Sequence, residues 1–105
     1  MSEKYDVKLS IEAEKDLQNI IIYIKDKLKE PIIAKRYAHL MKIEIESLKF
    51  NPQRYAIIDN KKIKDLKVRK LIIKNHIAFY RVDEQKNLVN VERILYGKSN
   101  WTIKL

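Results

Sequence analysis

The spacing of apolar residues in the first part of the chain predicts a strand followed by a helix. Apolar and polar residues alternate in "YDVKLS" (5–10), which is the period of a strand with one buried face. Ser10 then suits the N-cap of a helix, because its side chain can accept a backbone hydrogen bond there. One apolar helix face follows, with residues spaced by three and four at Ala13, Leu17, Ile21, Ile24 and Leu28.

A second helix is predicted to begin at Pro31, a residue that suits the first helical turn. Helical spacing continues from Ala34 to Leu48, and the helix should end before Asn51-Pro52, because the residue before a proline avoids the helical region. Only "KEP" separates the two helices, so we expect an antiparallel helical hairpin.

The second half of the chain predicts a loop over residues 51–66 and then three strands. The strand-like runs are "KVRKLII" (67–73), "HIAFYRV" (76–82) and "LVNVERIL" (88–95), with a tight turn at Lys74-Asn75. The order β-α-α-β-β-β predicts an α+β fold, a small antiparallel sheet with the helical hairpin packed on one face. At 105 residues, the chain is expected to form one domain spanning residues 1–105.

Composition narrows the function classes. The formal net charge is +9, which attracts polyanions or acidic proteins, although charge also keeps a protein in solution. There is no Cys, so disulfides and thiolate metal sites are excluded. The sequence has no metal-ligand spacing, nucleophile elbow or Gly-rich phosphate loop, and we expect no cofactor and no metal. Without an apolar leader or spanning segment, a cytoplasmic protein with no membrane partner is expected.

The densest charge lies in "KKIKDLKVRKLIIK" (61–74), where Asp65 is the one acid among seven Lys and Arg residues. If Leu71 and Ile73 face the helices, strand alternation places Lys70 and Lys74 on the open face of the sheet. Such a face could hold a phosphate backbone. The alternative is an edge strand whose lysines protect it from aggregation.

Three residues near the sheet have competing interpretations. Arg93 is in phase with apolar residues, so it needs a partner, for which Glu12 or Glu14 are candidates. The same phase puts Ile94 and Tyr96 on the open face beside Lys70. His76 starts a strand and could reach that face as a general base, or it could be a solvated turn residue.

The chain resembles the RelE/ParE superfamily, the toxins of type II toxin–antitoxin modules. The resemblance rests on "VKLSIEAEKDL", "NPQRY", "VRKLIIKNHIAFYRVDE" and "VERILYGKSNW", which cover nearly the whole chain in order. It implies a growth inhibitor that is neutralised by an acidic cognate antitoxin wrapped around it. RelE-like members are metal-independent ribonucleases that cut mRNA on the ribosome, whereas ParE-like members bind DNA gyrase and block it without catalysis.

The resemblance to the ribonucleases is incomplete. Lys70 matches a basic position of their second strand, but two expected arginines fall at Ile77 and Ser99. Lys does not reproduce the geometry of Arg, and charge stabilisation is usually the largest catalytic contribution. The sequence therefore favours a ParE-like gyrase inhibitor. The alternatives are a RelE-like interferase and an inactive binding member.

Site residues follow from these interpretations. For the interferase alternative, the candidate catalytic residues are Arg69, Lys70, His76, Tyr96 and Lys98. For target binding they are Lys61, Lys62, Lys64, Lys70, Lys74, Tyr96 and Lys98. Arg93 and Trp101 are expected to be structural, with Trp101 packing the tail back over the sheet after Gly97. Trp101 is also the nearest counterpart of a tail Tyr in the ribonucleases.

Overall fold

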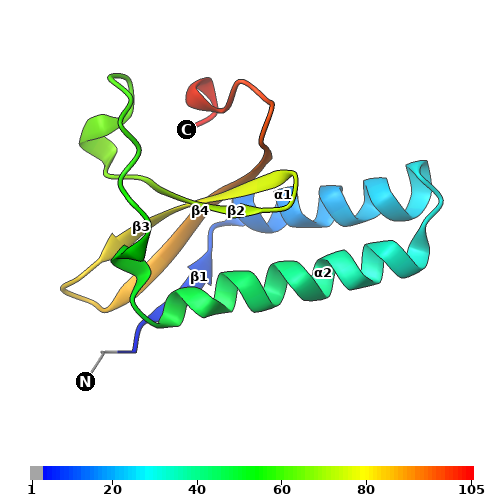
Figure 1. The fold of residues 1–105 in the computed structure, drawn as a ribbon, viewed down its shortest axis with the longest axis horizontal. Coiled ribbons are helices and arrows are strands. Elements are labelled where there is room, and N and C mark those ends of the chain that lie inside the picture. Colours follow the sequence, from blue (N-terminus) through cyan, green and yellow to red (C-terminus); the bar gives the residue numbers. More distant parts are fainter. Residues whose placement is uncertain (1–3) are drawn as a thin grey trace.

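The computed structural model describes residues 4–105, which form the elements predicted from the sequence, in the predicted order (Figure 1). The helices and strands are β1 (Asp6–Leu9), α1 (Ile11–Ile22), α2 (Pro31–Glu46), β2 (Arg69–Ile73), β3 (His76–Asp83) and β4 (Leu88–Tyr96). None of the helices in the described part of the chain has the length and apolar character needed to cross a membrane.

Local sequence determines where the helical hairpin begins and turns. The Ser10 hydroxyl accepts a hydrogen bond from the Ala13 amide at 3.0 Å and so caps α1 as predicted. After α1 the helix loosens into one π-helical turn, Tyr23–Lys27, and Lys29 takes a left-handed conformation with φ 55°. Pro31 then begins α2. The far half of this hairpin extends beyond the sheet (Figure 1).

The strands form one sheet in the order β1-β4-β3-β2, and it is mixed rather than wholly antiparallel. The β2–β3 and β3–β4 pairs are antiparallel, as their short connections require. By contrast, β1 pairs with β4 in parallel, from Asp6 opposite Leu88 to Leu9 opposite Val91. No tight turn joins β1 to β4, so nothing in the sequence pattern imposed the antiparallel direction that we expected.

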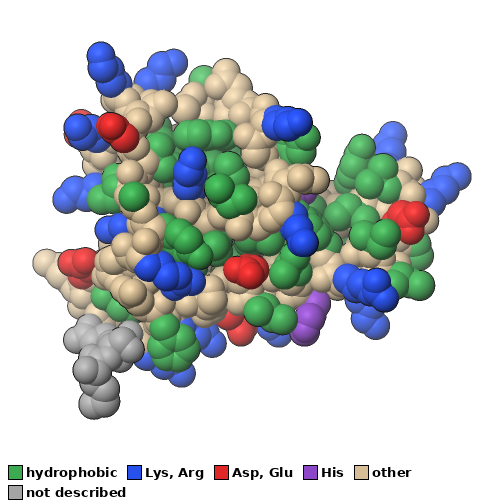
Figure 2. Space-filling model, in the orientation of Figure 1, with side chains coloured by type: hydrophobic (Ala, Val, Ile, Leu, Met, Phe, Trp, Pro, Cys, Tyr) green, Lys and Arg blue, Asp and Glu red, His purple; other side chains and the backbone are tan. Residues whose placement is uncertain are grey.

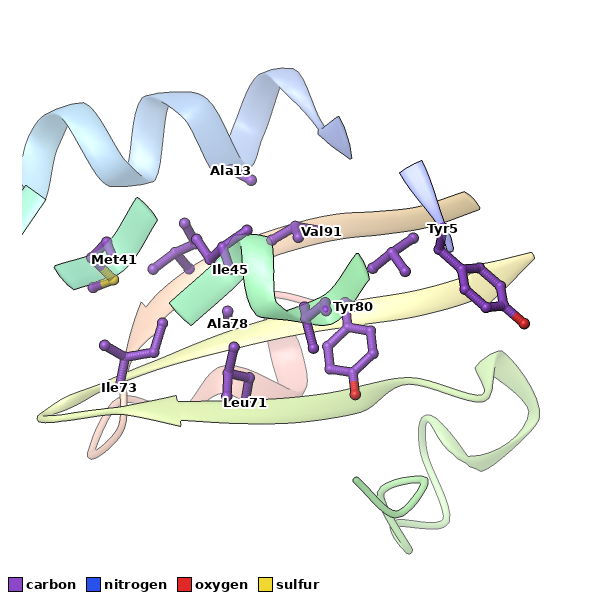
Figure 3. Packing of buried hydrophobic residues seen from close by; sticks show 12 residues of the cluster. Tyr5, Ala13, Met41, Ile45, Leu71, Ile73, Ala78, Tyr80 and Val91 are labelled. Atoms are coloured by element: carbon purple, nitrogen blue, oxygen red, sulfur yellow. The ribbon is translucent and has the colours of Figure 1, made fainter. Parts of the chain in front are cut away.

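The main core lies between the sheet and the helical hairpin. Leu71 and Ile73 face the helices, as the alternation in β2 predicts, and Figure 3 shows them below Met41 and Ile45 of α2. The buried members of this cluster are Tyr5, Ala13, Met41, Ile45, Leu48, Leu71, Ile73, Ala78, Tyr80, Val89, Val91 and Ile94.

A β-bulge in β4 changes which of its residues face the helices. Val91 lies opposite Tyr80 but Arg93 lies opposite Phe79, so Glu92 is the extra residue. The bulge reverses the alternation after position 92. Ile94 is therefore buried on the helix side, and Tyr96 pairs with His76 on that same side. The expected position of Ile94 and Tyr96 beside Lys70 is wrong.

The second face of the sheet is covered by a smaller apolar cluster and is not open as expected. The loop before β2 and the C-terminal tail lie over it, away from α2 (Figure 1). The Trp101 ring packs on Phe79 with 5.0 Å between ring centroids. The buried residues are Ile58, Ile63, Val68, Ile77, Phe79 and Leu95, with Trp101 and Leu105 packed against them.

Arg93 pairs with Asp16, and the expected partners Glu12 and Glu14 were wrong. Its Nε and Nη2 donate to the Asp16 carboxylate at 2.7 and 2.9 Å. This ion pair raises the pKa of Arg93 above its ordinary value. The same carboxylate accepts the Ile94 amide at 2.9 Å, so it also closes the edge of β4 beyond the last residue paired with β1.

Candidate functional site

The end of the sheet near the helical hairpin brings several candidate residues together. Lys74 and Asn75 form the two-residue turn between β2 and β3, with Lys74 at φ 55°. The Gly97 amide donates to the Asn75 carbonyl at 2.8 Å, which joins the end of β4 to this turn. His76, Tyr96 and Lys98 consequently lie at the same end of the sheet.

His76 lies between two tyrosines on the helix side of the sheet. The Tyr37 hydroxyl is 2.6 Å from His76 Nδ1 and also donates to the Ile73 carbonyl at 3.2 Å. The Tyr96 ring meets His76 edge-on, with centroids 5.9 Å apart. Burial lowers the pKa of His76 and raises the pKa of Tyr37, so both side chains are neutral near pH 7. His76 therefore occupies neither position that the sequence suggested.

These three rings form one wall of an apolar cleft of about 670 Å³ at the hairpin. Tyr23 and Leu28, near the turn of the hairpin, are about half exposed, at 54% and 52%. Figure 2 shows hydrophobic side chains gathered on the far half of the hairpin. The cleft is lined by Asn19, Ile20, Tyr23, Ile24, Leu28, Ile33, Tyr37, Asn75, His76 and Tyr96.

Arg69 lies at the other end of β2, and its guanidinium is hydrogen-bonded within the protein. One guanidinium nitrogen donates to the carbonyls of Tyr55, at 2.5 Å, and Gln53, at 3.2 Å. Five steps along the strand, or about 17 Å, separate it from Lys74 in the turn. Nearby, burial raises the pKa of Tyr80 to about 12, and its hydroxyl donates to the Pro52 carbonyl at 2.6 Å. Arg69 thus fastens the loop to the sheet.

The candidate lysines other than Lys98 lie on the side of the sheet opposite the cleft. Lys70 and Lys74 are exposed and alternate with the helix-facing Leu71 and Ile73. Lys61, Lys62 and Lys64 are exposed on the loop that covers the second face. The structure therefore separates the predicted catalytic set, because His76, Tyr96 and Lys98 are close together while Arg69 and Lys70 are not among them.

Sequence reasoning missed Tyr37 as a site residue, because its helical spacing indicates a core position. Only the contact with His76 shows that its hydroxyl lines a cleft, and nothing local in the sequence announces a contact between residues 37 and 76. Among residues 4–105, no group of three or more His, Asp or Glu side chains is arranged to hold a metal ion. The chemistry of the cleft suits an apolar segment, and that of the exposed lysines across the sheet suits anions.

Comparisons with known proteins give a family and a fold. Residues 7–101 match the family model described as the ParE toxin of the type II toxin–antitoxin system, parDE. None of the curated proteins matches significantly. A chain of a chromosomal ParDE system from P. aeruginosa is similar in structure, with TM-score 0.71 and 18% identity over 89% of this chain and 96% of that one.

A second structural relative comes from the RelBE2 toxin–antitoxin complex of Mycobacterium tuberculosis. Its TM-score is 0.62 at 18% identity, covering 90% of this chain and 92% of that chain. At such low identity these two likenesses show the fold, and the family model supplies the family.

Proposed function

The chain belongs to the ParE toxin family of type II toxin–antitoxin systems, and we propose that it inhibits DNA gyrase by binding, without catalysing a reaction of its own. Inhibition of gyrase is typical of ParE toxins. Membership of the family also implies a cognate antitoxin.

The main support for the proposal is that residue 77 is a buried isoleucine. A ribonuclease of the superfamily is expected to hold an arginine there, but Ile77 is only 8% exposed and belongs to the apolar cluster on the second face. Arg69, the arginine of the neighbouring strand β2, is committed to the carbonyls of Tyr55 and Gln53. Neither position offers a free guanidinium to stabilise the phosphorane that forms during RNA cleavage. This favours a toxin that inhibits by binding over a ribonuclease.

The antitoxin is expected to be acidic and to place an apolar segment in the cleft at the hairpin. Ile33 and Tyr23 present about half of their surfaces to solvent there, and burying them would supply the affinity. The positive charge of the chain would speed the encounter with an acidic partner and make it depend on salt.

A supercoiling assay with purified gyrase tests the function. Added toxin should stop the introduction of supercoils into relaxed plasmid, and equimolar antitoxin should restore the activity. Unimpeded supercoiling at a large excess of folded toxin would contradict the proposal.

The interferase remains the second candidate, because His76, Tyr96 and Lys98 do lie together at one end of the sheet. Pulse labelling after brief induction in bacterial cells separates the two functions. An early stop in DNA synthesis with continuing translation supports gyrase inhibition. Rapid loss of translation, with messages cut inside codons, supports the interferase. If neither synthesis changes while the protein accumulates, the chain is an inactive binding member.

A further inference from the structure

The loop over the second face is held in a defined shape and presents lysines to solvent. We call residues 56–67 of this loop, together with the exposed β2 residues Lys70 and Lys74, the lysine lobe. Ile58 and Ile63 are buried in the apolar cluster under it. The Ile58 amide donates to the Val68 carbonyl at 2.8 Å, and internal hydrogen bonds close the turns that follow. The lobe is therefore preorganised.

The outward positions of the lobe carry almost only positive charge. Lys70 and Lys74 stand on β2, and Lys61, Lys62, Lys64 and Lys67 stand on the loop, all exposed. Asp59 and Asp65 are the acids within the lobe. No carboxylate of the described residues lies within 4.0 Å of these lysine nitrogens. Figure 2 shows Lys and Arg side chains standing out around this part of the molecule.

Lysine-rich surfaces are more typical of binding sites for phosphates than of protein–protein interfaces. Lys is depleted in protein–protein interfaces, whereas Lys and Arg supply most contacts to the phosphates of nucleic acids. Towards β3 and β4 the charges are mixed, because Asp83 and Glu92 line a pocket there with Lys67, and Glu92 pairs with Arg81 at 3.9 Å. A polyanion would therefore run along β2 towards the Lys74 turn. Lys70 and Lys74 are about 13 Å apart along the strand, which corresponds to the rise of about four base pairs along the axis of duplex DNA.

We infer that the lysine lobe holds the phosphate backbone of duplex DNA while the toxin is bound to gyrase, an inference that rests on the proposed function. The contact is independent of sequence, because flexible lysines on an exposed loop reach phosphates and not base edges. The cleft on the other side of the sheet is left for the antitoxin.

Binding to a short, mixed-sequence DNA duplex tests the inference, measured by fluorescence anisotropy over a range of salt concentrations. The wild-type toxin should bind, with log K falling linearly against log salt. Each lost lysine–phosphate contact should lower that slope by about 0.9. The lobe variant carries the changes Lys61→Gln, Lys62→Gln, Lys64→Gln and Lys70→Gln. Its affinity for the duplex at moderate salt should be lower than that of the wild type by about tenfold or more.

A matched control removes the same charge from the helical hairpin, across the sheet from the lobe. It should keep both the affinity and the slope of the wild type, since its lysines are exposed on the other face. Equal losses in the two variants would show that net charge alone matters and would overturn the inference. The control carries Lys15→Gln, Lys25→Gln, Lys35→Gln and Lys42→Gln.

Four further outcomes distinguish failure of the inference from failure of the proposed function. Gyrase inhibition by a lobe variant that no longer binds DNA would overturn the inference and leave the function standing. DNA binding through the lobe by a toxin that does not affect gyrase would support the DNA site and remove the function. Stronger binding of single-stranded RNA, or loss of antitoxin binding in place of DNA binding, would assign the lobe to that partner and overturn the inference.

Discussion

Asp16 joins α1 to β4 at the place where the sheet would otherwise have an open edge. Its carboxylate accepts two hydrogen bonds from Arg93 and one from the Ile94 amide, and its side chain is 13% exposed. Removing it would leave a guanidinium and a backbone amide without their partner, which costs more than the loss of an average surface contact.

We expect Asp16→Ala to lower the free energy of unfolding by about 2–3 kcal/mol, because a partly buried charge and an amide are left unpaired. Urea denaturation monitored by circular dichroism measures the change. Gln18→Ala, at an exposed position of the same helix, should stay within about 0.5 kcal/mol of the wild type. Similar losses in the two variants would remove the special role assigned to Asp16.

The stability of the fold should depend on the titration of His76. Burial lowers the pKa of its imidazole, so the unfolded chain binds a proton at a higher pH than the folded chain does. The contribution of His76 to the free energy of unfolding is therefore complete above the ordinary pKa of about 6.5. It is lost as the pH falls through the lower pKa of the folded state.

A variant with His76→Asn should consequently show a flatter decline in unfolding free energy between neutral and mildly acidic pH. Urea denaturation of both proteins at matched pH values provides the comparison. Parallel curves for the variant and the wild type would mean that other groups cause the decline.

Single residues also show where site prediction from sequence fails. Exposure of the lysines in 61–74 followed from their charge, and their alternation with Leu71 and Ile73 was correct. The surroundings of Ile77 and His76 depended on the tail and on Tyr37, which lie far away in the sequence. An Ile77→Arg change would supply one of the two arginines that the resemblance to the ribonucleases leads us to expect, but it would bury a guanidinium in an apolar cluster.

At the level of elements, periodicity predicted both α-helices and all four strands of the described residues, but it did not predict that α1 ends at Ile22 or that short helical turns such as Tyr23–Lys27 and Trp101–Ile103 form. The strong signals were the Ser10 cap, Pro31 at the start of α2, and the two-residue turn at Lys74-Asn75. The bulge at Glu92 and the parallel pairing of β1 with β4 were missed. Both depend on contacts between distant segments, which no local pattern of hydrophobicity encodes.

The C-terminal tail is an element that two apolar side chains, Trp101 and Leu105, attach to the second face of the sheet. Trp101 packs on Phe79, which is fully buried, and Arg93 donates from Nη1 to the Lys104 carbonyl at 3.3 Å. Trp101 is the larger of the two apolar side chains that the tail packs on the cluster, the other being Leu105, whereas Ile103 is 69% exposed. The position of the tail therefore follows the packing of Trp101.

We expect Trp101→Ala to release the tail and to cost about 1–3 kcal/mol, less than a fully buried aromatic would. Hydrogen exchange should show faster exchange over residues 99–105, with little change in the helices. Ile103→Ala, in the same tail but exposed, should leave exchange there unchanged. Unaltered protection of the tail in the Trp101 variant would contradict the anchoring role.

Across the whole molecule, the sheet separates two surfaces of different chemistry. The apolar cleft lies on the side of the helical hairpin, and the lysine lobe lies on the other side. Antitoxin and nucleic acid could thus bind to different faces of the same toxin. Changes in the cleft should then affect neutralisation more than they affect toxicity.

Ile33→Asp should weaken antitoxin binding by about tenfold or more, because a charge would have to be buried in the apolar cleft. Ile33 is 49% exposed in the free protein, so the fold should tolerate the change. Isothermal titration calorimetry with the antitoxin measures the affinity. Ile43→Asp is a matched control, since Ile43 is 52% exposed on α2 and outside the cleft. Equal affinities for the two variants would place the antitoxin elsewhere.

The parallel pairing of β1 with β4 has a consequence for how the toxin is made. Asp6 pairs with Leu88, and the Ser10 hydroxyl donates to the Glu92 carbonyl 82 positions later. As the chain leaves the ribosome, the helical hairpin can form early from local contacts, but β1 has no partner until the last strand has been synthesised. Completion of the sheet therefore waits until β4 has been synthesised, which gives an antitoxin already present in the cell time to meet the nascent toxin before it becomes active.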